Sequence, residues 1–110
     1  MQFISTRGTS PAVTASEAIL KGLAPDGGLY VPAFFPHIPM ERLVGATSYP
    51  ELAFEILAPF FVGDELEKDL PEICVEAFDF PVPLHWHDKK DSVLELYWGP
   101  TAAFKDFGAR

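Results

Sequence analysis

The sequence predicts a mixed α/β fold, in which three or four short helices pack on short strands. Three observations indicate this class. Hydrophobic residues make up 48% of the chain, which is enough for a packed core. Two Ser/Thr-x-x-Glu capping boxes, Thr14–Glu17 and Ser48–Glu51, open apolar runs of helical spacing. Short apolar runs such as Leu29–Val31 end at proline or glycine, as strands bounded by turns do.

Two strands and one helix are expected first. Gln2–Thr6 alternates in polarity and predicts a strand. The helix after Thr14 should end near Gly22, because glycine readily adopts the left-handed conformation that stops a helix. Pro25–Gly28 predicts a turn, since proline presets its own torsion angle and the glycines permit positive φ. Leu29–Val31 then forms the second strand.

A helical segment and a hairpin should follow. The two adjacent phenylalanines of the loop Ala33–Pro39 are expected to hold that loop on the core. Helices are predicted from Ser48 and over residues 71–77, each with proline in a tolerated early position. Two strands, Leu84–His87 and Ser92–Tyr97, are joined by a polar turn and lead into a last helix that carries Lys105.

The charge and the cysteine count exclude several classes of protein. Sixteen acidic residues against eight basic ones give a formal charge of −8, so no basic stripe exists for nucleic acid or an anionic membrane. Cys74 is the only cysteine, which rules out an intrachain disulfide and favours a reduced, cytoplasmic setting. We also expect no signal peptide and no membrane span.

Lys105 is the strongest candidate for chemistry. It lies at the predicted start of a helix, where the helix dipole disfavours a cation, so this is a poor place for a purely structural lysine. Phe104 and Phe107 predict a partly desolvated setting, which favours the neutral form of an amine. A neutral amine is the form that attacks a carbonyl group. The alternative is a solvated lysine, the common state of this residue type.

Three other groups of residues are candidates for a binding or catalytic site. Ser5–Gly8 places hydroxyls beside an arginine and a glycine, which can receive an anion, although a strand end turning into a loop fits as well. His85 and His87 could meet on one strand face, but without a Cys or His partner group they predict exposed histidines and no metal site. Cys74, within an apolar helix, is expected in the core.

Three blocks of sequence carry a family resemblance. They are Ile4–Gly8, Gly22–Pro32 and Gly99–Asp106, whose last residues read Gly-Pro-Thr-Ala-Ala-Phe-Lys-Asp. In this order and spacing the chain closely resembles the N-terminal region of threonine synthase, in the branch with an extra N-terminal domain. The resemblance spans essentially the whole chain, although residues 33–83 contain no diagnostic motif.

The resemblance implies an enzyme of the tryptophan-synthase-β fold type (fold type II) with pyridoxal 5'-phosphate (PLP) as cofactor. Threonine synthases convert O-phospho-L-homoserine and water to L-threonine and phosphate. Lys105 matches the lysine that binds the cofactor covalently and then shuttles protons. Thr101 and Asp106 flank it, and we expect them to orient the lysine or its helix within the cofactor site. Near the substrate phosphate we expect Ser5, Thr6 and Arg7.

The resemblance also predicts how the chain is divided. Residues 1–83 should form the N-terminal domain, and residues 84–110 the ribbon and the start of the PLP-binding catalytic domain. Because family members continue well beyond the lysine, we expect a fragment that is inactive alone. Two alternatives stay open: a threonine-synthase-like phospholyase acting on another phosphorylated amino acid, and a non-catalytic module that only binds a partner.

An exposed apolar surface is expected at the C-terminal end. In a complete enzyme this surface would pack on the catalytic body. Its exposure would exceed the roughly few hundred Å² that monomers usually tolerate, so we expect the chain to self-associate. The residues expected to be exposed are Val93, Leu94, Leu96, Tyr97, Trp98, Phe104 and Phe107.

Overall fold

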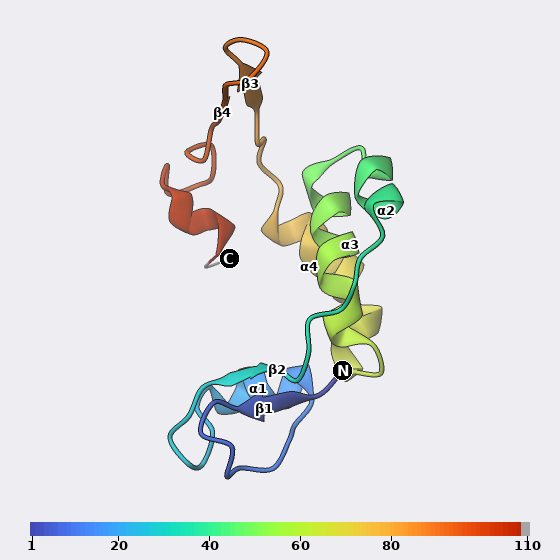
Figure 1. Cartoon of the computed structure of the whole chain (residues 1–110), viewed down its shortest axis with the longest axis vertical. Helices are drawn as coiled ribbons and strands as arrows, with labels where there is room; N and C mark the ends of the chain where they lie inside the picture. The colour runs from blue at the N-terminus through green and yellow to red at the C-terminus, as the bar shows by residue number, and fades with distance from the viewer. Residues whose placement is uncertain (109–110) are drawn as a thin grey trace.

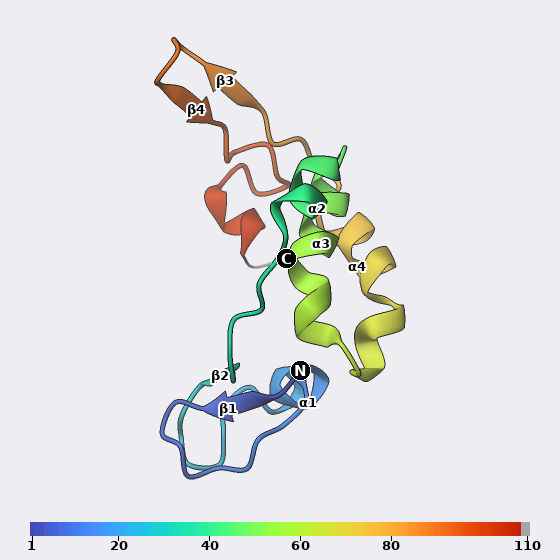
Figure 2. The same ribbon diagram turned by 45° about the vertical axis from the view of Figure 1, so that its right-hand side comes forward.

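A computed structural model describes residues 1–108 of the chain, and its architecture is shown in Figure 1. Two separate two-stranded antiparallel sheets flank a group of short helices, so the predicted mixed α/β class is confirmed. The molecule is elongated, measuring 50 × 28 × 28 Å. In Figures 1 and 2 the first sheet lies at one end and the second sheet at the other. No helix among residues 1–108 is long and apolar enough to cross a membrane.

The N-terminal unit contains β1 (Phe3–Ser5), α1 (Ala15–Lys21) and β2 (Tyr30–Pro32). The two strands pair antiparallel, with Ile4 opposite Val31. The predicted capping box of α1 is formed, because the Thr14 side chain accepts from the Glu17 N–H and the Glu17 carboxylate accepts from the Thr14 N–H. Local sequence therefore determines this helix start.

The helical body contains α2 (Met40–Gly45), α3 (Tyr49–Phe61), the 3₁₀ turn η1 (Glu65–Lys68) and α4 (Leu70–Ala77). Helices α3 and α4 pack side by side in both views (Figures 1 and 2). Their contact buries a small core of Ala53, Leu70 and Cys74, as expected for the cysteine. Burial raises the pKa of the Cys74 thiol, so this group is not a reactive nucleophile.

Helix α2 was not predicted, because Pro39 supplies no side-chain cap that would mark its start. Two expectations about this middle region are wrong. The second capping box is only half formed: Ser48 caps the Glu51 N–H, but the Glu51 carboxylate accepts from Thr47. The phenylalanine pair does not enter the core. Phe34 and Phe35 are 62% and 83% exposed, and Phe35 only touches the edge of Phe60.

One buried carboxylate links the N-terminal unit to the helical body. Asp64 accepts from the Ser16 N–H at 3.0 Å and from the Ser16 hydroxyl at 2.7 Å. The same carboxylate accepts from the Leu66 N–H at 2.9 Å. Desolvation opposes ionisation, but the hydrogen bonds from Ser16 and Leu66 outweigh it, and the pKa of Asp64 lies below its ordinary value. The two parts of the chain are therefore joined through a charged group.

The second sheet is a hairpin of β3 (Leu84–Trp86) and β4 (Ser92–Leu94). Both strands are shorter than predicted. The Asp88 carboxylate closes the turn by accepting from the N–H groups of Lys90 and Asp91. The hairpin projects away from the helical body in both views (Figures 1 and 2). After β4 the chain runs without regular structure to the segment that carries Lys105.

Candidate functional site

Lys105 lies in a 3₁₀ turn, η2 (Phe104–Phe107), and not in the longer helix that the sequence predicted. The last two residues of that predicted helix and of the proposed segment 84–110, Ala109 and Arg110, lie outside the described residues. The turn is preceded by Ala102 with a φ of 52°, an uncommon conformation for a residue other than glycine. A left-handed residue at this position stops a helix from starting at Thr101.

Hydrogen bonds between Thr101 and Asp106, called here the clasp, close the turn that carries Lys105, called here the lysine turn. The Asp106 carboxylate accepts from the Thr101 N–H at 3.0 Å and from the Thr101 hydroxyl at 2.9 Å. Asp106 is only 3% exposed. The backbone of Gly99 lies against Asp106, because a Cβ atom placed on Gly99 would overlap the Asp106 side chain. Thr101 and Asp106 are thus hydrogen-bonded to each other around the lysine turn, a contact that the sequence did not predict.

Phe107 fixes the turn on the helical body. Its ring lies 5.1 Å from that of Phe80 and 5.7 Å from that of Tyr49, between centroids. Tyr49 is the first residue of α3, and its burial raises the pKa of its hydroxyl. Phe107 is therefore half-buried, which corrects the expectation that it lies on an exposed apolar surface. Leu96 is also half-buried, whereas the other expected residues of that surface are exposed, namely Val93, Leu94, Tyr97, Trp98 and Phe104.

The Lys105 side chain is exposed, and within residues 1–108 it forms no hydrogen bond or ion pair. Phe104 is 70% exposed and does not cover it. The expected desolvated setting is therefore wrong for the described chain, because Phe107 packs on Tyr49 and Phe80 and Phe104 is itself exposed. The structure therefore provides a turn closed by the Thr101–Asp106 hydrogen bonds, on which the Lys105 amine has no partner within residues 1–108.

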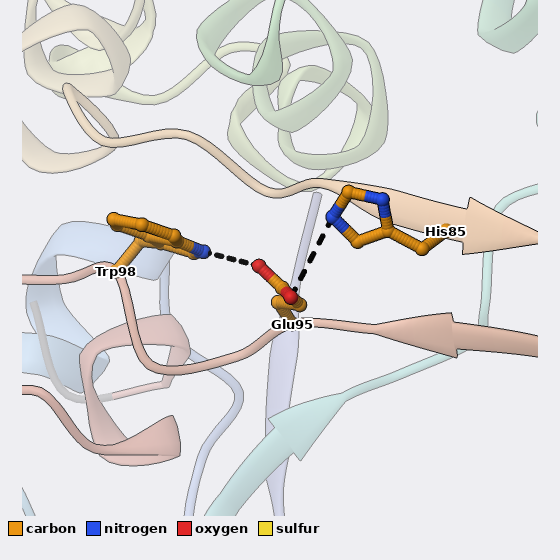
Figure 3. Close-up of polar contacts among 3 residues, drawn as sticks. All are labelled: His85, Glu95 and Trp98. Carbon is orange, nitrogen blue, oxygen red and sulfur yellow. Dashed lines mark hydrogen bonds and ion pairs between the residues drawn. The ribbon is translucent and has the colours of Figure 1, made fainter.

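Glu95 organises the approach to this turn (Figure 3). Its carboxylate accepts from the Trp98 indole N–H at 2.6 Å and lies 3.5 Å from His85 Nε2. Hydrogen bonds from Trp98 and from the Tyr97 hydroxyl, together with His85, lower the pKa of Glu95. His85 thus pairs with a carboxylate. No group of three or more His, Cys, Asp or Glu side chains suited to a metal ion occurs among the described residues.

The Ser5–Arg7 segment is bound to Asp26. The Asp26 carboxylate accepts five hydrogen bonds, and the shortest is from the Ser5 hydroxyl at 2.7 Å. These bonds, above all that of Ser5, hold the pKa of Asp26 well below its ordinary range. The Arg7 guanidinium donates to the Asp26 carbonyl at 3.0 Å. The other donors to the carboxylate are the Thr9 N–H, the Thr9 hydroxyl, the Ser10 N–H and the Gly28 N–H.

The two groups of predicted site residues are not brought together. The N-terminal unit with Ser5 lies at the far end of the molecule from the hairpin, and the lysine turn lies alongside the upper part of the helical body (Figures 1 and 2). Asp26 was missed as a structural centre because Pro25–Gly28 was interpreted only as a turn. The signal was present, since Asp in a turn often accepts from nearby backbone N–H groups.

These features define the class of the chain: a mixed α/β region in which Lys105 is exposed on a turn that is closed by side-chain hydrogen bonds. A family model described as "Threonine synthase N terminus" matches residues 2–78. The chain belongs to this family.

Curated relatives and solved structures extend over nearly the whole chain. Threonine synthase of Pseudomonas aeruginosa is 41% identical over 97% of the chain and 24% of its own length. Threonine synthase-like 2 of Homo sapiens is 36% identical over 96% of the chain and 24% of its own length. The structure of PLP-bound threonine synthase from Brucella melitensis superposes with a TM-score of 0.83 at 41% identity, over 96% of the chain and 24% of its own. The chain therefore spans about a quarter of the length of these relatives.

Proposed function

We propose that this chain is the N-terminal part of a PLP-dependent threonine synthase. The reaction is the conversion of O-phospho-L-homoserine and water to L-threonine and phosphate, in the biosynthesis of threonine in the cytoplasm. The observation that carries the proposal is Lys105, exposed and unpaired among the described residues, on a turn within the motif that resembles the family's cofactor-lysine motif. Membership of the threonine synthase family supports it.

The residues of the turn fit a covalently held cofactor. Attachment needs an accessible amine that is not held by an acid. The neighbouring carboxylate, Asp106, is directed to Thr101, so it does not neutralise Lys105. When bound, PLP supplies an electron sink for the bonds at the amino-bearing carbon of the substrate. Lys105 would hold the cofactor and then move protons, while Thr101 and Asp106 hold its backbone in place.

The proposed division of the chain places this turn in the catalytic domain. Residues 1–83 would form the N-terminal domain and residues 84–110 the start of the PLP-binding domain. The hairpin supports this division, since it projects away from the helical body (Figures 1 and 2).

Thr6 and Arg7 are the proposed donors to the substrate phosphate. Because they lie away from the lysine turn here (Figures 1 and 2), the proposal requires that the full-length enzyme brings the N-terminal unit to that turn, from the same or a second copy. Arg7 is exposed and forms no ion pair with a carboxylate in the part of the chain that the structure describes. Ser5 is a poorer donor, because its hydroxyl proton is committed to Asp26. In the full-length enzyme, Arg7→Gln should raise the KM for the phosphorylated substrate by roughly tenfold if the guanidinium meets the phosphate. An unchanged KM would remove this assignment and leave the role of Lys105 intact.

Borohydride reduction tests the central assignment. In the full-length protein loaded with PLP, reduction followed by peptide mapping should place a pyridoxyl group on Lys105. Lys105→Ala should remove the bound-cofactor absorbance, and Lys89→Ala, at the hairpin tip, is the matched control. A label on Lys21 or Lys68 would contradict the assignment. The chain of 110 residues alone is expected to release no phosphate above the rate with free PLP, because one lysine provides little binding energy.

A phospholyase acting on another phosphorylated amino acid is the second candidate. The similarity to a protein named threonine synthase-like 2 favours it. Comparing phosphate release from O-phospho-L-homoserine and from other phosphorylated amino acids, at full length, separates the two. A chain without any cofactor on Lys105 and without either activity would support the non-catalytic, partner-binding alternative.

The exposed apolar residues around the hairpin support self-association of the isolated chain. Val93, Tyr97, Trp98 and Phe104 are each at least half exposed. Covering them would remove apolar area from water, which favours association. Light scattering should show a mass that rises with concentration, and a constant monomer mass would exclude this behaviour.

A further inference from the structure

The segment between β4 and the lysine turn has no regular secondary structure, yet side chains hold it. The Glu95 N–H donates to the Pro83 carbonyl at 3.0 Å, which registers the start of the segment against the strand opposite. The Glu95 carboxylate then accepts from Trp98 Nε1 at 2.6 Å and approaches His85 from the other side (Figure 3). The Glu95 side chain is 19% exposed, although Trp98 is 50% exposed.

Trp98 is continuous with the clasp around Lys105. The next residue, Gly99, lies against the Asp106 side chain, and its carbonyl accepts from the Ala102 N–H at 3.0 Å. A shift of Trp98 therefore moves Gly99, and Gly99 cannot move toward Asp106 without displacing it. Asp106 is the immediate neighbour of Lys105. The indole bond is thus connected to the lysine through two residues in direct contact.

We propose that Glu95 is a positioning residue for Lys105, acting through the Trp98 indole to fix the lysine turn relative to the hairpin. The inference rests on the proposed function of Lys105. Among residues 1–108, Glu95 forms no hydrogen bond or ion pair with Lys105; its side-chain partners are Trp98, Tyr97 and His85. Its effect is geometric, because a reacting group displaced by about 1 Å can lose up to roughly a hundredfold in rate. His85 is a secondary partner, since its separation from the carboxylate is longer and its side chain is 65% exposed.

The test uses the full-length, PLP-loaded enzyme and two nearly isosteric variants. Trp98→Phe removes the indole N–H and keeps an aromatic ring. Glu95→Leu keeps the approximate size and removes both oxygens that can accept from the indole. Each should lower kcat by roughly tenfold while KM changes less than about twofold, since ground-state binding is not involved. The double variant should be no slower than either single variant, because both remove the same interaction.

Trp86→Phe is the matched control. It makes the same chemical change at the other tryptophan, which is 65% exposed in β3, and it should leave kcat and KM unchanged. Thermal midpoints are measured for every variant, because a merely structural role would lower the midpoint and the active fraction together. If Trp98→Phe is unstable, Glu95→Leu decides.

Three results would overturn the inference: unchanged kcat in Glu95→Leu, independent losses that multiply in the double variant, or a loss of kcat that only follows the folded fraction. Borohydride labelling of Lys105 in the same preparations separates this failure from failure of the proposed function. A labelled Lys105 with unchanged kcat in both variants refutes the role of Glu95 alone. An unlabelled Lys105 in the wild-type enzyme refutes both.

Discussion

Two aspartates at opposite parts of the molecule each close a loop, but they do so over different distances along the chain. Among residues 1–108 the Asp106 carboxylate accepts side-chain and backbone hydrogen bonds from Thr101 alone, five residues away. Asp26 accepts from Ser5, Thr9 and Ser10, up to 21 residues away, and also from Gly28. The first clasp shapes one turn, whereas the second joins β1, the following loop and the β2 approach. We therefore expect damage at Asp106 to stay local and damage at Asp26 to spread through the N-terminal unit.

The largest difference is expected when the glycine that packs against each hydrogen-bonded aspartate is substituted, namely Gly28 near Asp26 and Gly99 near Asp106. A Cβ atom on Gly28 would overlap the Ser5 hydroxyl, and one on Gly99 would overlap Asp106. Overpacking of this kind costs about 1–3 kcal/mol. Gly28→Ala should lower the thermal midpoint of the whole chain, and Gly99→Ala should mainly increase amide exchange over residues 101–107. Gly45→Ala is the control, because a Cβ there meets no atom within 4 Å. Equal falls in the midpoint for both variants would contradict the comparison.

Asp106→Ala should produce a smaller, local effect. It removes both acceptor oxygens and leaves the Thr101 N–H without this partner, and a donor left without a partner costs about 1–3 kcal/mol when it is buried. Hydrogen exchange measured by NMR should show lost protection at the Thr101 amide, with α1 unchanged. Protection at Thr101 equal to that of the wild type would show that the carboxylate does not close the turn.

A titration at low pH should distinguish Asp26 from an ordinary carboxylate, because the pKa of Asp26 is lowered. The folded pKa of Asp26 is depressed, so its stabilising contribution is present above the unfolded value of about 3.9 and declines as the pH falls below it. Carboxyl carbon shifts should show Asp26 still ionised near pH 3, when ordinary carboxylates have largely titrated. Asp26→Asn should flatten the loss of stability below about pH 4. An Asp26 carboxyl that titrates at its ordinary pKa would contradict the network.

How far the sequence predicted the molecule depends on the distance over which each interaction acts. The Thr14 box and the Asp88 turn each act within four consecutive residues, and both were predicted in place. The lysine turn differed, because the Asp106 carboxylate turns back to Thr101 and a local pattern favoured a continuous helix. The local bond from the Gly28 N–H to Asp26 was predictable from the turn, whereas the donors Ser5, Thr9 and Ser10 were not, since they come from a distant segment whose fold was not known. The expected desolvated environment of Lys105 was wrong, so its assignment depends on the motif alone.

The shared carboxylate of Asp64 has a consequence for how the chain folds. It caps η1 through Leu66 and binds the start of α1 through Ser16, 48 residues earlier in the sequence. The Ser16 donors belong to the N-terminal unit, and the Asp64 carboxylate and the Leu66 N–H belong to the helical body. The start of α1 therefore gains its hydrogen bonds to Asp64 only when the two parts have docked. An elongated chain with a small core would otherwise melt in pieces. We therefore expect Ser16→Ala to split one unfolding transition into two, with the N-terminal unit melting first.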